Sequence, residues 1–391
     1  MTATDDSAIP AEPSRPRLVY VVSEDWYFLS HRLPMARAAR EAGFEVHVAT
    51  RIVEGRGKIA AEGFRPHHIP FARGRLSLPA SLATIRALRR LHRELRTDIV
   101  HHVSLQPTVL GQVATRGLDI GSVNALTGLG FAFASAKAKA ALVRTALRAV
   151  LRRLLNRPRT AVIVQNDDDR RALRRLGIRD DHIGLIAGSG VDIRRFRPLP
   201  EPDGPFTVAF VGRLLEDKGI RILVEAHRIL RARGLTVRLL IAGLPDAANP
   251  ASISPREVGD WDIEPGIHWL GHVEDISTVW AEAHVAVLPS RREGLPLSLL
   301  EAAACGRALI ATDAPGCRDV VRPGLTGLLT PLDDAVALAD AIAWMDSHPD
   351  DRQRFGAAAR TMAEQEYAAG LIGQEAAAVY QRLMREGAAA S

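Results

Sequence analysis

A short stretch in the second half of the chain combines a turn-forming glycine with two cations. Gly212 and Arg213 directly follow an apolar run, 207–211, and Lys218 comes five residues after Arg213, before a segment with helical periodicity. Glycine permits a tight turn, and the free N–H groups of a following helix favour an anion. Arginine binds phosphate through two nitrogens, while lysine acts as a compact charge. The stretch predicts a diphosphate-binding loop, although two solvated surface cations would give the same pattern.

Two glutamates, Glu293 and Glu301, flank the start of another expected helix. They follow the apolar run 285–288, and Pro296 between them suits a first helical turn. Gly294 permits a ligand to approach the backbone closely. A carboxylate accepts two hydroxyl hydrogen bonds at once, which suits a ribose diol or a pair of sugar hydroxyls. Each glutamate alone is equally explained as a surface acid or a helix-start acid, and their combination with the two cations is more specific.

Short apolar runs alternate with helical segments along the chain, and these elements must position the candidate residues. The expected strands are 18–22, 46–49, 99–103, 161–164, 207–211, 237–242, 285–288 and 309–312, and the expected helices include 78–95, 167–176, 220–233, 297–305 and an Ala-rich pair over 351–386. This alternation predicts an α/β fold with two doubly wound Rossmann-like domains. Ligands bind such domains at the carboxyl ends of the strands, so we expect the reaction in the cleft between the domains.

Proline marks the expected domain boundary. Residues 197–205 hold four prolines and a glycine, which continue neither a helix nor a central strand. We therefore expect a disordered tail at 1–16, an N-terminal domain over 17–198 and a C-terminal domain over 199–370. The last segment, 371–391, is expected to form a helix that packs back toward the N-terminal domain.

Composition narrows the function. The chain of 391 residues is 47% apolar, with no run long enough to span a membrane and no secretory leader pattern, so a cytoplasmic protein is expected. The net charge of +6 combines a basic first half with an acidic second half, and a basic half favours a polyanion or an anionic membrane. Two cysteines, Cys305 and Cys317, are expected to be reduced and cannot build a zinc site alone.

Two further classes fit poorly. A dehydrogenase would carry Gly-x-Gly-x-x-Gly after the first strand, and none is present. A nucleic-acid-binding protein would interleave aromatic side chains with the cations of the basic half, and few are found there.

Taken together, the motifs resemble the retaining glycosyltransferases of family 4, which have the GT-B fold. The resemblance rests on Gly212-Arg213, Lys218 and the Glu293-x7-Glu301 pair, and it covers nearly all of residues 205–345. The segment 189–198 also looks like that family's interdomain loop, and the segments 306–312 and 324–329 look like its closing strands.

The resemblance implies a role for each residue of the C-terminal, sugar-nucleotide-binding domain. Arg213 and Lys218 would hold the diphosphate beside Gly212, Glu301 would bind the ribose, and Glu293 would contact the transferred sugar. Backbone N–H groups near Gly294 and Leu295 would bind sugar and phosphate. The family's chemistry retains the anomeric configuration, with the leaving phosphate helping to deprotonate the acceptor, so no protein nucleophile, cofactor or metal is implied.

The N-terminal half resembles a narrower group, the bacterial exopolysaccharide and O-antigen transferases that act on lipid-linked sugars. This resemblance rests on 23–34, 98–102 and 124–130, although the glycine pair common in the family's first loop is absent. Many relatives place a histidine after the fifth strand, where Thr127 stands here. Thr127 and His31 are therefore candidate catalytic residues beside Glu293.

Two features of the N-terminal, acceptor-binding half have alternative explanations. His101 and His102 are candidates for acceptor or phosphate contacts, or a buried pair at a strand end. The acid-free segment 137–159, with Arg144, Arg148 and Arg152, predicts an amphipathic helix that lies on an anionic membrane or packs its leucines on the sheet. The acids at 167–169 indicate a helix start rather than a metal site.

We therefore predict a retaining glycosyltransferase that moves a hexose or N-acetylhexosamine from a UDP-linked donor to a lipid-linked saccharide. It would work as a peripheral membrane enzyme at the inner face of the plasma membrane, in bacterial surface polysaccharide synthesis. The alternatives are a sugar-nucleotide epimerase on the same fold and a non-catalytic nucleotide-sugar-binding scaffold.

Overall fold

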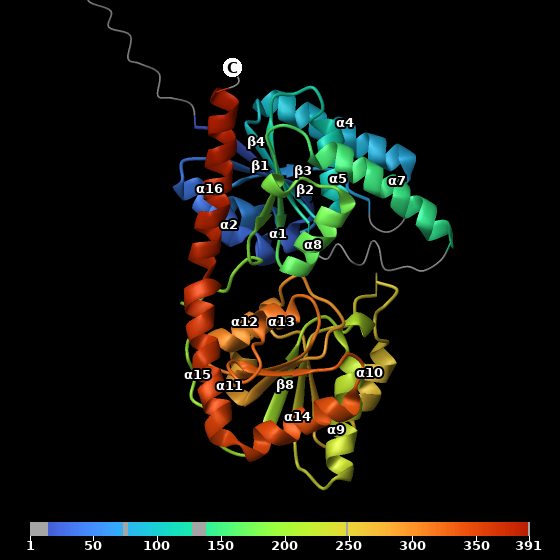
Figure 1. Cartoon of the computed structure of the whole chain (residues 1–391), viewed down its shortest axis with the longest axis vertical. Coiled ribbons are helices and arrows are strands. Elements are labelled where there is room, and N and C mark those ends of the chain that lie inside the picture. The colour runs from blue at the N-terminus through green and yellow to red at the C-terminus, as the bar shows by residue number, and fades with distance from the viewer. Residues whose placement is uncertain (1–14, 73–76, 127–137, 248, 390–391) are drawn as a thin grey trace, which may run out of the picture.

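The structure, a computed structural model, describes residues 15–72, 77–126, 138–247 and 249–389, with side chains of 138–146 left out. The expected tail therefore lies almost wholly outside the described residues. Figure 1 shows two α/β lobes stacked along the long axis of the molecule.

Parallel strands form the sheet of the N-terminal lobe. Among the described residues the strand order is β3-β2-β1-β4-β5-β6-β7. The strands are β1 Arg17–Glu24, β2 Glu45–Arg51, β3 Arg65–His68, β4 Ile99–Val103, β5 Gly121–Ala125, β6 Thr160–Val164 and β7 Ile183–Leu185. The helices are α1 Asp25–His31, α2 Leu33–Glu41, α3 Arg56–Ala61, α4 Leu78–Leu95, α5 Leu105–Ala114, α7 Ala138–Leu155 and α8 Asp167–Leu176, with a 3₁₀ turn at Asp180–His182. Both faces of the sheet are covered by apolar side chains, as a parallel sheet requires.

The C-terminal lobe repeats this design, with the order β10-β9-β8-β11-β12-β13 in the part of the chain that is described. Its strands are β8 Thr207–Val211, β9 Arg238–Ala242, β10 Ile267–Gly271, β11 Val285–Leu288, β12 Ala308–Thr312 and β13 Gly327–Thr330. Its helices are α9 Ile220–Ala232, α10 Pro255–Asp262, α11 Ser277–Glu282, α12 Leu297–Ala304, α13 Cys317–Val320, α14 Ala335–Ser347 and α15 Pro349–Glu366, with a 3₁₀ turn at Glu216–Lys218. The predicted α/β class with two doubly wound domains, the GT-B architecture, is confirmed.

Strand order fixes where each lobe can bind a ligand. The first strand of each lobe, β1 or β8, pairs with a strand on either side, so the chain reverses direction across the sheet between β1 and β4 and between β8 and β11. Doubly wound sheets bind ligands at this switch point, beyond the carboxyl ends of the strands. The two candidate loops follow β8 and β11, so the fold brings them together.

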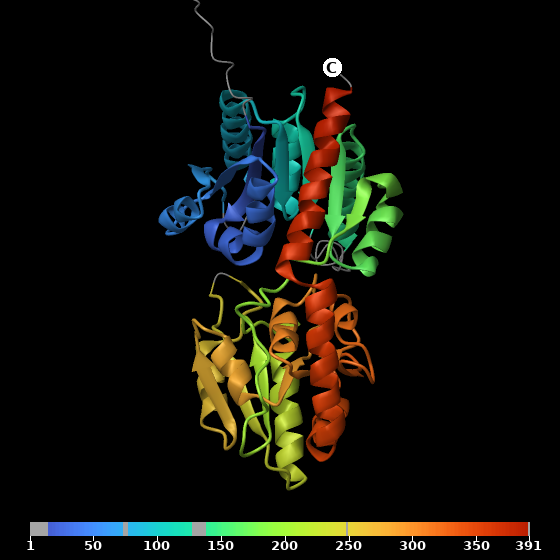
Figure 2. The ribbon, with the colours of Figure 1, turned by 90° about the vertical axis from the view of Figure 1, so that its left-hand side faces the viewer.

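The last two helices run along one side of both lobes. Helix α15 packs on the C-terminal lobe, and α16, Ala369–Ala388, packs on the N-terminal lobe (Figure 2). At their junction Val191 exchanges backbone hydrogen bonds with Tyr367 and Ala369, at 2.7 and 2.9 Å. The two segments that cross between the lobes are therefore paired with each other.

Candidate active site

A cavity of about 650 Å³ opens where the two lobes face each other. Its walls come from both lobes, through the residues Tyr27, His31, Arg32, Gln165, Gly188, Ser189, Arg213, Leu215, Asp217, Lys218, Asn249, Arg291, Arg292, Glu293, Gly294, Leu295 and Leu297. A volume of this size suits a small-molecule substrate.

The turn after β8 places Lys218 in the cavity wall. Gly219 ends this turn with φ of +70°, and a Cβ there would lie 1.9 Å from the carbonyl oxygen of Pro289. Only glycine fits so close to that backbone, so the turn lies against the chain that leaves β11. Arg213, at the start of the turn, is exposed and pairs with Asp246 at 3.1 Å.

The loop after β11 is tied to this turn by hydrogen bonds. The Ser290 hydroxyl and the Arg291 N–H both donate to the carbonyl oxygen of Asp217, at 3.0 and 2.9 Å. From the other side, the Glu293 N–H donates to the carbonyl of Pro315 at 2.9 Å. The two loops therefore form one structural unit whose relative geometry is fixed.

The two candidate loops meet in an ion pair. Lys218 Nζ lies 2.6 Å from Glu293 Oε1, and both side chains are largely buried. A charge-assisted hydrogen bond at this distance is strong. Both residues line the cavity, so a cation and a carboxylate face the same space.

Glu301 lies in the second turn of α12, outside the set of residues that line the cavity. Burial raises its pKa from 4.5 to about 8, because low-dielectric surroundings disfavour the charged form. Within the described residues its carboxyl group has no hydrogen-bond partner. Gly212, at the end of β8, also lies outside the cavity lining.

The first helix of the N-terminal lobe supplies the opposite wall. It begins at Asp25, a buried carboxylate that accepts hydrogen bonds from Val53 and Gly55, at 2.7 and 2.8 Å. At the other end of the helix, His31 stacks on Tyr27 with ring centroids 4.3 Å apart. Burial, with nearby cations, lowers the pKa of His31 to about 4, so the imidazole is neutral near pH 7.

Arg32 was missed by the sequence reasoning, although it directly follows His31. It lines the cavity and is only 2% exposed. Its Nε and Nη2 atoms have no hydrogen-bond partner among the described residues. A buried guanidinium normally has its donors paired, and the only sequence signal was a cation close to a candidate histidine.

Two family models match the chain. One, described as glycosyl transferase 4-like, matches residues 17–166, and the other, described as glycosyl transferases group 1, matches residues 205–347. These ranges correspond to the two lobes, and the second contains both candidate loops. The chain belongs to glycosyltransferase family 4, with the GT-B fold.

Curated relatives of this glycosyltransferase include enzymes named for lipid-linked acceptors. The N,N'-diacetylbacillosaminyl-diphospho-undecaprenol alpha-1,3-N-acetylgalactosaminyltransferase of Campylobacter jejuni is 24% identical over 381 residues, 92% of this chain and 98% of the relative. The UDP-Gal:alpha-D-GlcNAc-diphosphoundecaprenol alpha-1,3-galactosyltransferase of Escherichia coli is 26% identical over 293 residues, 72% of this chain and 74% of the relative. Anabaena HepE, solved in complex with UDP and glucose, shares the fold with a TM-score of 0.76 at 17% identity, over 93% of this chain and 99% of that one.

His101 and His102 are core residues of this glycosyltransferase, which corrects the expectation that they contact acceptor or phosphate. Both are fully buried in β4. His101 Nδ1 hydrogen-bonds the Tyr380 hydroxyl of α16 at 2.7 Å, and His102 Nδ1 lies 3.0 Å from Asn124 Oδ1. Burial lowers the pKa of His102 to about 4 and that of His101 well below its usual range. The alternative of a buried strand-end pair describes both.

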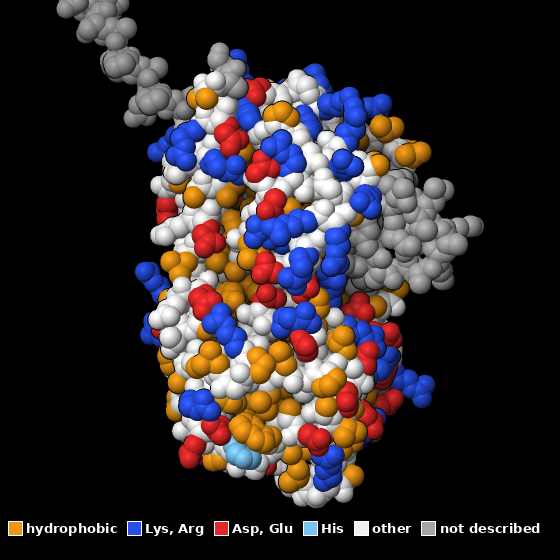
Figure 3. Space-filling model, viewed as in Figure 1, with side chains coloured by type: hydrophobic (Ala, Val, Ile, Leu, Met, Phe, Trp, Pro, Cys, Tyr) orange, Lys and Arg blue, Asp and Glu red, His pale blue; other side chains and the backbone are white. Residues whose placement is uncertain are grey.

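The basic helix α7 packs through its apolar side. Leu151 and Leu155 are buried in a cluster with residues of β6 and α8. Arg148 and Arg152 are exposed, while the side chain of Arg144 lies outside the described part of the structure. Figure 3 shows Lys and Arg side chains gathered over the N-terminal lobe on this face of the molecule. Membrane contact by this helix stays a prediction, as does the role of Thr127, which also lies outside the described residues.

Three further properties concern metals, membranes and thiols. Across the described ranges, no group of three or more His, Cys, Asp or Glu side chains is arranged to hold a metal ion. No helix in those ranges combines the length and apolar character needed to cross a bilayer. Cys305 and Cys317 are buried free thiols, and burial raises the pKa of Cys305 to about 12.

Proposed function

We propose that this glycosyltransferase transfers a sugar, with retention of configuration, from a UDP-linked donor to a lipid-linked saccharide. The donor would be a hexose or N-acetylhexosamine nucleotide, and the product would serve bacterial surface polysaccharide synthesis. The observation that carries the proposal is the Lys218–Glu293 pair, at 2.6 Å, in a cavity walled by both lobes.

Each candidate residue has a chemical role in this proposal. Lys218 and Arg213 meet the charge of the donor diphosphate, so no metal is required. Glu293 binds hydroxyls of the transferred sugar, and Glu301 binds the ribose. The diphosphate oxygen released from the sugar takes the acceptor proton on the same face, so the anomeric configuration is kept without a protein nucleophile.

Support for the acceptor class comes from the named relatives. Both are named for transfer to a saccharide carried on a diphospho-undecaprenol, and both names specify an alpha-1,3 linkage. The acceptor would enter along the N-terminal wall, where neutral His31 and buried Arg32 lie. We propose that the exposed cations of α7 bring this lobe to the anionic inner face of the plasma membrane.

The test is transfer by purified enzyme. It is incubated with lipid-linked saccharide extracts and a panel of UDP-sugars, and both released UDP and the anomeric configuration of the product are measured. Glu293→Gln is expected to lose transfer, whereas Arg228→Gln, which removes the ion pairs of this α9 side chain with Glu225 and Glu264, is the matched control. Absence of transfer and of UDP release with every donor would refute the proposal, and conversion of donor without acceptor would indicate an epimerase.

A further inference from the structure

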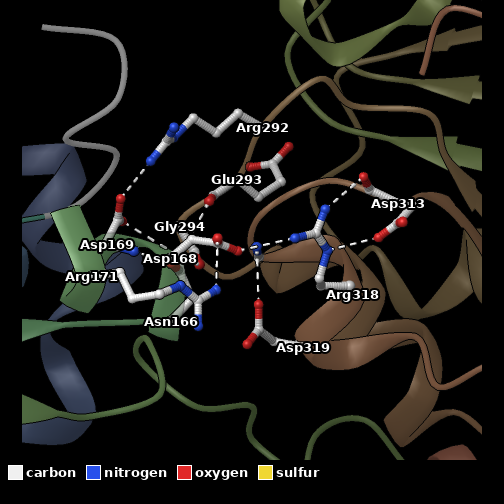
Figure 4. A network of polar contacts seen from close by, with 11 residues as sticks. Asn166, Asp168, Asp169, Arg171, Arg292, Glu293, Gly294, Asp313, Arg318 and Asp319 are labelled. Carbon is white, nitrogen blue, oxygen red and sulfur yellow. Dashed lines mark hydrogen bonds and ion pairs between the residues drawn. The ribbon is translucent and has the colours of Figure 1, made fainter. Parts of the chain in front are cut away.

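The N-terminal lobe contacts the loop after β11, residues 289–296 (the donor loop), through one buried amide. Asn166, only 1% exposed, donates from Nδ2 to the carbonyl oxygen of Gly294 at 2.7 Å (Figure 4). The orientation of this amide is set by its own helix, because Oδ1 accepts a hydrogen bond from the Asp169 N–H at 2.8 Å and caps α8. The Nδ2 group of Asn166 must therefore face the other lobe.

An ion pair joins the same two segments. Arg292 Nη2 lies 2.6 Å from Asp169 Oδ1, and the Asp169 side chain is completely buried. Arg292 immediately precedes Glu293, so this pair acts on the backbone that carries the candidate sugar-binding carboxylate. A second cross-lobe pair, Arg318 with Asp168 at 3.3 Å, lies nearby and is more exposed.

The donor loop is also confined from within its own lobe. Gly316 has φ of +80°, and a Cβ there would lie 2.6 Å from the carbonyl oxygen of Glu293. The loop therefore lies between the segment before α13 on one side and the first turn of α8 on the other, as Figure 4 shows. Its backbone has little freedom while the lobes stay together.

The hydrogen bond to the Gly294 carbonyl also fixes the direction of the Leu295 N–H, because both groups belong to one planar peptide. In a planar trans peptide the carbonyl and the following N–H point in opposite directions. The carbonyl of Gly294 points to Asn166, which does not line the cavity, so the N–H of Leu295 points away from Asn166. Leu295 lines the cavity, and within the described residues its N–H makes no hydrogen bond. This N–H is a free donor two residues before α12, whose N-terminus favours an anion.

We propose that Asn166 and Asp169 are positioning residues, which orient the Gly294–Leu295 peptide and Glu293 for the diphosphate and sugar of the donor. Donor affinity then depends on contact between the lobes, although neither residue lines the cavity. This inference rests on the proposed function, since it names what orients the same site.

Asn166→Asp isolates the proposed contact. The aspartate keeps a side-chain oxygen that caps α8, but it cannot donate to the Gly294 carbonyl and faces it with a negative charge. Arg171→Gln is the matched control, because Arg171 pairs with Asp168 inside α8 and, among the described residues, makes no hydrogen bond or ion pair to the C-terminal lobe. Asp169→Asn tests the ion pair with Arg292 in a side chain of the same shape.

The measurements are UDP affinity by calorimetry, KM for the donor, kcat, and the melting temperature without ligand. We expect Asn166→Asp and Asp169→Asn to weaken UDP binding and raise the donor KM about tenfold or more. Arg171→Gln should leave both unchanged, and wild type and control should melt alike. A purely structural role for Asn166 would lower the melting temperature and leave the donor KM of the folded fraction unchanged.

The outcomes separate this inference from the proposed function. If the wild type binds neither UDP nor any other nucleoside diphosphate, the proposed function itself fails. If the wild type binds UDP and both variants bind it equally well with the same donor KM, the positioning role is overturned. If Asn166→Asp does not fold, Asp169→Asn decides by the same criterion.

Discussion

We expect donor binding to depend on pH through Glu301, a partly buried acid in α12. Its pKa is raised by burial to about 8, so near pH 7 only about one tenth of the ligand-free protein carries the carboxylate. Ribose hydroxyls that donate to this group favour the ionised form. We therefore expect UDP binding to release a proton and to strengthen as the pH rises through about 8.

The size of the effect follows from the ionised fraction. If only the ionised form binds, the apparent affinity is the intrinsic affinity multiplied by that fraction. The fraction rises from about one tenth near pH 7 to about nine tenths near pH 9, so affinity should increase about tenfold. The terminal phosphate of UDP titrates near pH 6 and His31 near 4, so neither contributes in this window. Calorimetry at several pH values, in buffers of different ionisation enthalpy, measures both affinity and proton release.

Glu301→Gln provides the control and the refutation. Glutamine keeps a similar shape but does not titrate, so the variant should bind UDP with a flat pH profile and release no proton. A flat profile in the wild type, or an unchanged slope in the variant, would show that Glu301 does not bind the ribose as a carboxylate.

The same group affects stability with a defined sign. Because its folded pKa, about 8, lies above the ordinary 4.5, the folded ligand-free protein binds more protons than the unfolded chain between these values. The stabilising contribution is fully present below about pH 4.5 and is lost as the pH rises through about 8, by at most about 1.4 kcal/mol per pH unit. The difference in unfolding free energy between wild type and Glu301→Gln, followed across this window by urea titration, should show that slope.

Three further substitutions test the site and its support. Lys218→Met should raise the donor KM about 10- to 100-fold in steady-state kinetics. The substitution removes a charged hydrogen-bond donor to the diphosphate and leaves Glu293 unpaired. An unchanged KM would contradict the placement of the diphosphate. Gly219→Ala should cost about 2 kcal/mol or more of unfolding free energy. The control is Gly234→Ala, which has a similar φ of +79° but nothing near its Cβ, and which therefore measures the cost of the backbone conformation alone. Equal losses of unfolding free energy in the two variants would show that the close approach at Gly219 is unimportant. Tyr380→Phe should cost about 1–3 kcal/mol in urea unfolding, because two buried partners lose their hydrogen bond, and a neutral result would contradict that network.

Apolar runs in the sequence located strands β1, β2, β4, β6, β8, β9, β11 and β12 and both candidate loops, but they did not locate β3, β5, β7, β10 and β13. Strands β4, β8 and β11 begin and end where the apolar runs predicted, because a buried parallel strand is a short continuous apolar segment. The loops could be located because each directly follows such a strand. That they lie side by side follows from the strand order, in which β8 and β11 are neighbours.

The histidine pair shows what local patterns cannot supply. His101 and His102 lie near the carboxyl end of the predicted strand 99–103, a position that often carries function. His102 packs against Asn124 of β5 and Gly111 of α5, whereas the burial of His101 depends on α16, which brings Tyr380 onto β4 from 279 residues away. No local periodicity encodes that contact, because it depends on how a distant helix packs. The same limit applies to Asn166 and Arg292, whose segments come from different lobes.

The Lys218–Glu293 pair joins the residue proposed to bind the donor diphosphate to the residue proposed to bind the donor sugar. The cation that would bind phosphate neutralises the carboxylate that would bind the sugar, at 2.6 Å. A largely buried carboxylate without that partner would be costly, so the pair helps to keep the loop ordered. A diphosphate competes for Lys218, and a sugar supplies hydroxyl donors for the Glu293 oxygens that Lys218 releases. A donor that carries both groups satisfies both residues, whereas a nucleoside diphosphate alone engages Lys218 and leaves Glu293 to water. Intact sugar nucleotide should therefore order the loop from Arg292 to Leu295 more fully than UDP does, which hydrogen exchange of these amides measures directly, and equal protection by the two ligands would contradict the exchange of partners.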